Sequence, residues 1–264
     1  MQTYLDQIIQ LKKQEVEQAK IQQPIHLLQQ QALYKRHKIS AKKAIVDPDK
    51  TGIIAEFKRK SPSKGYIHKN ALVESIIPQY EKAGASMISI LTDRPFFGAQ
   101  TDDFSQAREL STIPLLRKEF IIDAYQLHES KAMGADVILL IASCLGKKEI
   151  ATFTQIAHDL DMEVLLEIHT EKQLETYSTD IDLVGINNRN LETFEVDLAH
   201  SRKLLTQLPA ESIKIAESGL NSPETVLALK EERFHGFLIG EHFMKTDNPG
   251  KSFAQFNNEI KQTK

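Results

Sequence analysis

The chain has 264 residues, a formal net charge of −3 and a sequence pI of about 6.3, and 41% of its residues are hydrophobic and 26% charged. This composition is typical of a folded globular protein, and the small net charge gives no electrostatic reason to expect binding to nucleic acid or to an acidic membrane. Because Cys144 is the only cysteine and the sequence has neither a secretory leader nor a membrane-spanning apolar run, we expect a cytoplasmic protein without an intramolecular disulfide.

The first fifty residues predict helices rather than strands. Residues 3–20 mix leucine, isoleucine and valine with lysine, glutamate and glutamine at helical spacing, and Pro24 interrupts the pattern. Residues 25–43 are again typical of a helix, with a glutamine-rich patch that we interpret as a solvated helix face. We therefore expect residues 1–50 to form a helical extension of one domain that spans residues 1–264.

From residue 52 onward, short apolar runs alternate with longer segments of helical spacing, as expected of repeated strand–helix units. The eight runs are 53–58, 86–91, 115–120, 136–141, 163–168, 183–187, 213–217 and 236–240. Eight such units predict a closed (β/α)8 TIM barrel of the α/β class. A doubly wound open sheet is the structural alternative, but the first run lacks the Gly-x-Gly-x-x-Gly turn of its dinucleotide-binding version.

The first run carries two opposite charges. Glu56 and Lys58 are two positions apart, so in a strand both side chains point to the same face, which we assign to the barrel interior. Charges in such a place are costly to desolvate unless they are paired or used. The Ser-Pro-Ser-Lys-Gly sequence at 61–65 follows directly and offers hydroxyls, an ammonium group and a tight turn. We expect this loop to bind a phosphate or a carboxylate.

Polar residues recur at the carboxyl ends of the predicted strands, where barrel enzymes hold their active sites. One lysine or glutamate there is compatible with a surface ion pair, whereas several at one barrel mouth indicate an active site. The converging residues are Glu56, Lys58, Lys118, Glu167, Asn187 and Glu217. Glycine-containing pairs follow the last two strands, the usual phosphate site of such barrels. We assign to that site Ser218, Gly219, Gly240 and Glu241, with Ser61 completing it from the first strand.

Six segments resemble the indole-3-glycerol-phosphate synthase family, which closes the indole ring in tryptophan biosynthesis. They are 55–63, 116–121, 166–168, 185–191, 216–219 and 238–241, in the family's order on six strands. The resemblance covers about residues 50–245. It implies a carbon–carbon lyase that converts 1-(2-carboxyphenylamino)-1-deoxyribulose 5-phosphate to indole-3-glycerol phosphate, with loss of carbon dioxide and water and without a metal or organic cofactor. The nine histidines have no His-Glu-x-x-His spacing, which agrees with that expectation.

The resemblance also assigns catalytic roles. Lys118 is implied as the general acid that protonates the substrate carbonyl, and Glu167 as the base that removes a proton as water is lost. Lys58 is implied either to neutralise the substrate carboxylate or to act as an acid during dehydration, and both roles stay open. Glu56 and Glu217 are implied to keep the lysines charged and oriented.

Substrate-binding residues follow from the same resemblance. Phe97 and Phe120 are implied to sandwich the anthranilate ring, and Asn187 to bind a substrate hydroxyl or the reacting region. The phosphate and other polar groups of the substrate are implied to contact Ser61, Arg189, Ser218, Gly219, Gly240 and Glu241, the last through its backbone N–H. Family members often carry Gly-Ser where this chain has Ala99-Gln100, so we expect the contacts of that loop to differ.

Two alternatives stay open at this point. Another phosphate-binding barrel, such as one like phosphoribosylanthranilate isomerase, would share the phosphate site but would not need two lysines and Glu167 at the strand ends. A catalytically silent barrel that binds a phosphate metabolite is the other. In each case we expect a small phosphorylated ligand as the partner, no nucleic acid or membrane, and at most weak association with other tryptophan-pathway enzymes.

Overall fold

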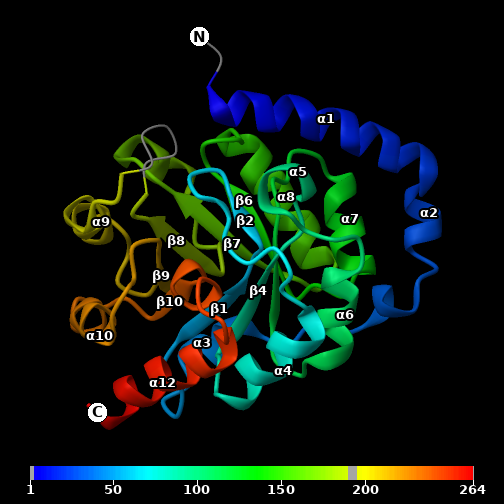
Figure 1. Cartoon of the computed structure of the whole chain (residues 1–264). Helices are drawn as coiled ribbons and strands as arrows, with labels where there is room; N and C mark the ends of the chain where they lie inside the picture. Colours follow the sequence, from blue (N-terminus) through cyan, green and yellow to red (C-terminus); the bar gives the residue numbers. More distant parts are fainter. Residues whose placement is uncertain (1–2, 190–194, 264) are drawn as a thin grey trace.

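The computed structural model describes residues 3–189 and 195–263 (Figure 1). Its centre is a closed barrel of parallel strands in the order β1-β10-β9-β8-β7-β6-β5-β4. The strands are β1 Ile53–Phe57, β4 Met87–Leu91, β5 Leu115–Lys118, β6 Val137–Ile141, β7 Glu163–Ile168, β8 Leu183–Asn187, β9 Lys214–Glu217 and β10 Gly236–Ile239. Ile54 of β1 is in register with Met87 of β4 and with Leu238 of β10, which closes the barrel. The predicted (β/α)8 barrel is confirmed, and the open sheet is excluded.

Strand side chains alternate between two apolar cores. Ile54, Leu116 and Leu165 belong to the core inside the barrel, whereas Ile53 and Val164 belong to the core between strands and helices. Both faces of these strands are therefore buried, as is usual for parallel sheets covered by helices. This burial explains why the eight runs are almost continuously apolar in the sequence, and why polar residues within them are informative.

Helices surround the barrel between successive strands. The longer ones are α4 Val73–Lys82, α6 Asp103–Leu110, α7 Tyr125–Ala132, α8 Lys147–Asp159, α9 Leu198–Leu205, α10 Pro223–Glu231 and α12 Pro249–Gln262. A 3-10 helix, η2 Glu171–Thr176, follows β7 in place of a longer α-helix. Two single-turn helices, α5 Arg94–Phe97 and α11 Glu241–Met244, begin at the carboxyl ends of β4 and β10 and so lie at the mouth of the barrel.

Helix α1, Tyr4–Gln22, crosses the barrel at the mouth end (Figure 1). Its start is fixed by a capping box, in which the Thr3 hydroxyl accepts from the Asp6 N–H at 3.1 Å and the Asp6 carboxylate accepts from the Thr3 N–H at 2.9 Å. Its buried residues Ile8, Lys12 and Val16 recur every four positions and form one face. The predicted amphipathic helix is confirmed, with a lysine in its buried stripe.

The prediction of a second helix over residues 25–43 is wrong. The segment contains short helices, α2 Ile25–Leu28, η1 Ala32–Lys35 and α3 Ala41–Ile45; a turn joins the first two, and extended residues 36–40 separate η1 from α3. The extended part binds the amino-terminal end of the barrel: the Ile39 N–H donates to Asp136 at 2.7 Å and the Ser40 hydroxyl donates to Glu163 at 2.6 Å. These long-range bonds override the local helical preference, and α3 then packs against the apolar core inside the barrel.

A small hairpin that the sequence pattern did not predict follows β1. Strands β2 Lys60–Ser61 and β3 Gly65–Tyr66 pair antiparallel, so the 61–65 sequence forms the tip of a hairpin at the barrel mouth. The hairpin places Ser61 beside the strand ends rather than in open solvent. Within the described ranges, the helices include none with the length and apolar character needed to cross a membrane.

Candidate active site

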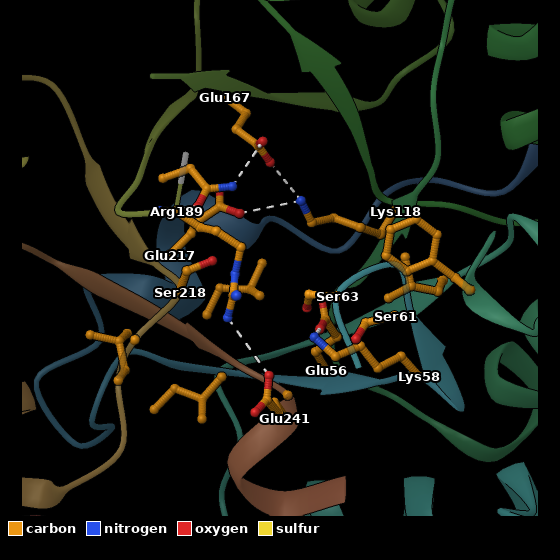
Figure 2. A pocket seen from close by; sticks show the side chains of 18 of the residues that line it. Glu56, Lys58, Ser61, Ser63, Lys118, Glu167, Arg189, Glu217, Ser218 and Glu241 are labelled. Atoms are coloured by element: carbon orange, nitrogen blue, oxygen red, sulfur yellow. Dashed lines mark hydrogen bonds and ion pairs between the residues drawn. The ribbon is translucent and has the colours of Figure 1, made fainter. Parts of the chain in front are cut away.

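A cavity of about 540 Å³ opens at the carboxyl ends of the strands, among the side chains of Figure 2. Every site residue predicted from the sequence lines it: Glu56, Lys58, Ser61, Phe97, Lys118, Phe120, Glu167, Asn187, Arg189, Glu217, Ser218, Gly219, Gly240 and Glu241. Residues 190 and 191 of the sixth-strand motif lie outside the described part of the chain. These side chains meet at the barrel mouth because alternate residues of each strand face the barrel interior and parallel strands all end at the same edge.

Lys118 lies at the centre of this group. Its Nζ is 2.6 Å from Glu167 Oε2 and 3.2 Å from Glu217 Oε2, and Figure 2 shows the three side chains converging. Burial by itself would lower the pKa of Lys118, but the negative charge of Glu167 outweighs it, so the pKa lies above its ordinary value. Lys118 is therefore a cation at neutral pH.

Glu167 and Glu217 have different charge states although both touch Lys118. Burial opposes ionisation of Glu167, but the adjacent Lys118 charge holds its pKa well below the usual range. For Glu217 burial dominates and, with the charge of Glu167, raises its pKa to about 8 against the pull of Lys118. Glu217 Oε1 also has no hydrogen-bond partner among the described residues. At neutral pH Lys118 and its two neighbours Glu167 and Glu217 thus form a group of one ammonium, one carboxylate and one carboxylic acid.

A network on β7 and β8 fixes the position of Glu167. Its Oε1 accepts a hydrogen bond from Asn187 Nδ2 at 3.1 Å and lies 3.2 Å from His169 Nε2. Asn187 in turn accepts from the Arg189 N–H at 3.0 Å, which holds the amide orientation. The base candidate is therefore held on one oxygen by the Asn187 amide of β8, and on the other by Lys118.

Glu56 of β1 and Lys58, which directly follows the strand, form a second ion pair in the cavity lining. Lys58 Nζ is 2.6 Å from Glu56 Oε1, and both side chains are largely buried. Gly240 makes room for this pair, since a Cβ on Gly240 would lie 2.3 Å from Glu56 Oε1. Glycine at that position is thus required by the close approach of a carboxylate rather than by backbone conformation.

The predicted phosphate residues gather at one end of the cavity. Ser218 and Gly219 have φ angles of 67° and 76° in a turn that Asn188 holds by donating to the Ser218 carbonyl at 2.7 Å. Ser61 is buried, and its Oγ has no hydrogen-bond partner in the described part of the chain. Helix α11 begins beside them at Glu241, so its first N–H groups are available to an anion.

At this end of the cavity, the side chains of Lys64 and Arg189 both lie close to the carboxylate of Glu241. Glu241 Oε1 is 3.3 Å from Lys64 Nζ of the β2–β3 turn, and Glu241 Oε2 is 3.7 Å from Arg189 Nη2 (Figure 2). A bound phosphate would compete with the Glu241 carboxylate for both. Lys64 was not among the predicted site residues, although its place in the 61–65 sequence pointed to it.

Phe97 and Phe120 lie against each other at the cavity edge. Their ring centroids are 6.1 Å apart with an interplanar angle of 43°. Aromatic pairs in direct contact have centroid separations of about 4.5–7 Å, so no third ring fits between the two as they stand. In this structure they form one apolar wall, which an aromatic substrate would contact from the cavity side.

The sequence interpretation missed His169. It stands two positions after Glu167, so the alternation that paired Glu56 with Lys58 also places it on the same side as Glu167. It went unnoticed because it lies just beyond the end of β7, where the alternation of a strand is no longer assured. Among the residues that the structure describes, no group of three or more His, Cys, Asp or Glu side chains is arranged to hold a metal ion.

Comparisons with known proteins agree with this geometry. Residues 5–256 match the family model described as indole-3-glycerol phosphate synthase. An indole-3-glycerol phosphate synthase from Bacteroides thetaiotaomicron is 46% identical over 256 residues, which is 97% of this chain and 98% of that relative. One from a Polaromonas species is 41% identical over 259 residues, with 97% and 98% covered.

Solved structures support the fold alone. A chain from the tryptophan synthase complex of Pyrococcus furiosus superposes with a TM-score of 0.59 at 15% identity, covering 81% of this chain and 98% of its own. A thiamine phosphate pyrophosphorylase from the same organism gives a TM-score of 0.58 at 14% identity, with 80% and 95% covered. These identities are too low to carry function between barrels.

Proposed function

The chain belongs to the indole-3-glycerol phosphate synthase family, and we propose that it carries out the reaction in the mouth cavity around Lys118. It is a carboxy-lyase of tryptophan biosynthesis that acts on a phosphorylated small molecule. The observation that supports this location best is the ammonium group of Lys118 held between two glutamates of unlike charge.

The reaction converts 1-(2-carboxyphenylamino)-1-deoxyribulose 5-phosphate to indole-3-glycerol phosphate. The ring carbon that bears the carboxylate attacks the ketone carbon, a carbon–carbon bond forms, and the ketone oxygen takes a proton to become a hydroxyl. The bond to the carboxylate then breaks, carbon dioxide leaves, and its electrons restore the aromatic ring. Finally the hydroxyl leaves as water and a neighbouring C–H proton is lost, which completes the indole.

Lys118 is the general acid in this proposal. Its ammonium group is charged at neutral pH because the carboxylate of Glu167 raises its pKa. A cation about 4 Å from a developing oxyanion contributes roughly 4 kcal/mol at an effective dielectric of about 20, and a positioned acid typically contributes about 10²- to 10⁴-fold in rate. Its buried place lets that charge act with little screening by water.

Glu167 is the base, and its neighbours prepare it for that task. Asn187 fixes the carboxylate from β8, and Lys118 keeps it ionised before the C–H proton is lost. Glu217, carrying its proton at neutral pH, orients Lys118 without adding a second full negative charge beside it. The two glutamates are thus proposed to serve different purposes because burial affects them differently.

The remaining residues orient the substrate along the cavity. We place the phosphate at the Ser61, Ser218, Gly219, Gly240 and Glu241 end, with Arg189 beside it. The anthranilate ring then lies against the wall formed by Phe97 and Phe120, and its carboxylate faces Lys58. Glu56 holds Lys58 for that contact. Lys58 as a second acid during dehydration is the competing assignment.

A direct assay tests the proposal. Purified protein is mixed with the carboxyphenylamino-deoxyribulose phosphate in the presence of a chelator, and indole fluorescence is followed. We expect product to appear, and Lys118→Ala to abolish most of the rate at saturating substrate. Binding without turnover would instead indicate a silent barrel, and turnover of phosphoribosylanthranilate alone would indicate an isomerase.

Three wider assignments belong to the same proposal. We infer that residues 1–264 act as one barrel domain with residues 1–50 as its extension, and that the protein works in the cytoplasm, where a lone, largely buried Cys144 stays reduced. Weak association with other enzymes of the pathway remains a prediction, and a pull-down with purified partners checks it.

A further inference from the structure

The phosphate group is the part of the ligand that the proposed reaction leaves unchanged. Bonds form and break at the ring carbon, the ketone carbon and the carboxylate, so substrate and product present the same phosphate to the protein. Contacts with a group common to both are uniform binding, which does not accelerate the chemical step. A phosphate held too tightly delays release of the product. This reasoning rests on the proposed function.

The phosphate end of the mouth cavity contains a carboxylate that faces two cations. Glu241 Oε1 is 3.3 Å from Lys64 Nζ, and Glu241 Oε2 is 3.7 Å from Arg189 Nη2. All three side chains line the cavity, and Figure 2 shows the Arg189 side chain extending toward Glu241. The Glu241 carboxylate therefore pairs with the same cations that a phosphate at this end of the cavity would use.

These ion pairs are looser and more exposed than the pair at the centre of the site. Lys118 and Glu167 are separated by 2.6 Å, as short as a tight charge-assisted hydrogen bond. The side chains of Lys64 and Glu241 are 59% and 31% exposed, against 13% for Lys118. Exposed ion pairs typically change an equilibrium by less than about fivefold. A stronger anion can therefore break them without disturbing the fold.

A buried hydroxyl at the same end of the cavity offers a further donor to an anion. Ser61 is 7% exposed, and its Oγ has no hydrogen-bond partner among the described residues. A phosphate oxygen would satisfy this hydroxyl, which is costly to bury unpaired. The Lys64 N–H donates to the Ser61 carbonyl at 3.4 Å, so one turn holds both residues. The long, flexible side chain of Lys64 lines the same cavity and can reach a phosphate bound at Ser61.

The phosphate is the stronger of the two competing anions. It carries close to two negative charges near neutral pH and offers three acceptor oxygens, whereas the Glu241 carboxylate carries one charge. Once phosphate has taken Lys64 and Arg189, the Glu241 carboxylate remains beside it as a like charge. Glu241 thus weakens phosphate binding in two ways, by occupying the cations beforehand and by repelling the bound phosphate afterwards.

We propose that the Glu241 side chain is a competing anion that limits the affinity of the phosphate site, and that Lys64 is a phosphate-binding residue. On binding, the phosphate takes Lys64 and Arg189 from the Glu241 carboxylate. On release, the carboxylate pairs with both cations again, which favours departure of the product. The exchange involves ion pairs alone, so no covalent bond changes and no proton is transferred.

Glu241→Gln tests the competition directly. Calorimetry on the full chain gives the dissociation constants for inorganic phosphate and for indole-3-glycerol phosphate. Both should fall about three- to tenfold, because two exposed ion pairs need no longer be broken and the like charge is gone. Stopped-flow displacement should show product dissociation slowed by a similar factor, since such affinity changes appear mainly in the dissociation rate. Glu74→Gln, exposed on α4 and outside the cavity lining, is the matched control and should change neither constant.

Lys64→Met tests the assignment of Lys64. Both dissociation constants should rise about threefold, and Glu241→Gln should tighten binding less in the Lys64→Met background than by itself, because the two residues share one contact. Lys69→Met is the matched control. Lys69 is exposed in the same connection between β1 and α4, lies over the Tyr66 ring and does not line the cavity, so its loss should leave both constants unchanged.

The opposite results are equally distinct. Weaker phosphate binding by Glu241→Gln would mean that the carboxylate only holds the two cations in place, and would overturn the competition. Unchanged binding by Lys64→Met would remove Lys64 from the phosphate site. Absence of product from the unsubstituted chain would overturn the proposed reaction, whereas the titrations with inorganic phosphate would still decide whether Glu241 and phosphate compete.

Discussion

The two ends of the barrel both bury carboxylates, but Asp136 at one end and Glu217 at the other differ in how many of their acceptor positions are filled. At the amino-terminal end the Asp136 carboxylate is fully buried, and each of its oxygens accepts two hydrogen bonds. The donors are Arg36, Arg108 and the backbone N–H groups of Ile39 and Leu115. At the mouth, Glu217 and Ser61 are also buried, yet each keeps an oxygen without a hydrogen-bond partner in the described part of the structure.

This difference separates a stabilising network from a reactive one. A buried carboxylate with all four acceptor positions occupied loses little relative to water and resists any change of protonation. A buried group with an unfilled position is destabilising until a substrate fills it, and its pKa is free to shift. We therefore expect substitutions at the mouth to affect turnover more than stability, and substitutions at the other end to do the reverse.

The largest effect is expected at the mouth. Lys118→Ala should lower kcat by about 10²- to 10⁴-fold with KM changed by less than about threefold, because the proposed general acid is lost while the proposed phosphate and ring contacts remain. Steady-state kinetics and thermal melting measured on one preparation check it. A Tm loss as large as that of a core substitution would place Lys118 with the stabilising network instead.

The counterpart at the other end is Asp136→Asn. Removing one charge leaves Arg36 and Arg108 without their carboxylate, and breaking such a buried pair typically costs about 3–5 kcal/mol. We expect that loss in denaturant unfolding, with kcat per folded molecule unchanged below the transition. A fall in kcat without a change in the unfolding midpoint would contradict the assignment of Asp136 to a network that only stabilises the fold.

Glu217→Gln tests whether the raised pKa of Glu217 lowers the stability of the folded chain. Glu217 has a folded-state pKa of about 8 against 4.5 ordinarily, so between these values the folded chain binds more protons than the unfolded one and stability falls as pH rises. The limiting slope is about 1.4 kcal/mol per pH unit. Glutamine removes this dependence, so the variant should gain about 3 kcal/mol relative to the unsubstituted chain between pH 6 and pH 9.

Unfolding curves at several pH values check the Glu217 prediction. The advantage of the variant should grow up to about pH 8 and then level off, as the folded-state titration ends there. An advantage that is constant with pH would mean that Glu217 does not carry a proton in the folded chain at neutral pH.

The smallest effect is expected where the extension meets the mouth. Lys12 of α1 lies 3.1 Å from Asp93 Oδ2 and 3.0 Å from Glu119 Oε1, and all three side chains are buried. Asp93 caps α5, which carries Phe97, and Glu119 accepts from the Phe120 N–H. This network pairs buried charges as the Asp136 network does, although Asp93 Oδ2 has no hydrogen-bond partner in the described part of the chain, and it supports the aromatic wall.

Lys12→Met should therefore change both the stability of the chain and its kinetics. We expect a loss of about 1–3 kcal/mol in stability, since two buried carboxylates lose a partner, and a KM raised about threefold with kcat little changed. Lys13→Met is the matched control because Lys13 is exposed on the same helix. Equal KM values for Lys12→Met and Lys13→Met would show that α1 does not influence the aromatic wall.

The sequence predicted the barrel and the residues of its mouth for a simple reason. Each of the eight strands is buried on both faces, so apolar runs marked them, and their ends differ from the prediction by at most two residues. Polar residues at those ends stood out against the runs. The segment 25–43 was predicted poorly because its bonds to Asp136 and Glu163 join residues about a hundred positions apart, which local periodicity does not record.

By itself, the sequence determined which residues each strand presents at the mouth, because alternation along a strand is a local property of the backbone. It placed Glu56 with Lys58 and carried enough family motif to place Lys118 and Glu167 at the same site. Only the tertiary structure decided which charges meet, since the distances among Lys118, Glu167 and Glu217 depend on the register of strands far apart in the chain. It also decided their protonation, because burial and neighbouring charge act through space: two glutamates equivalent in sequence become a carboxylate and an acid.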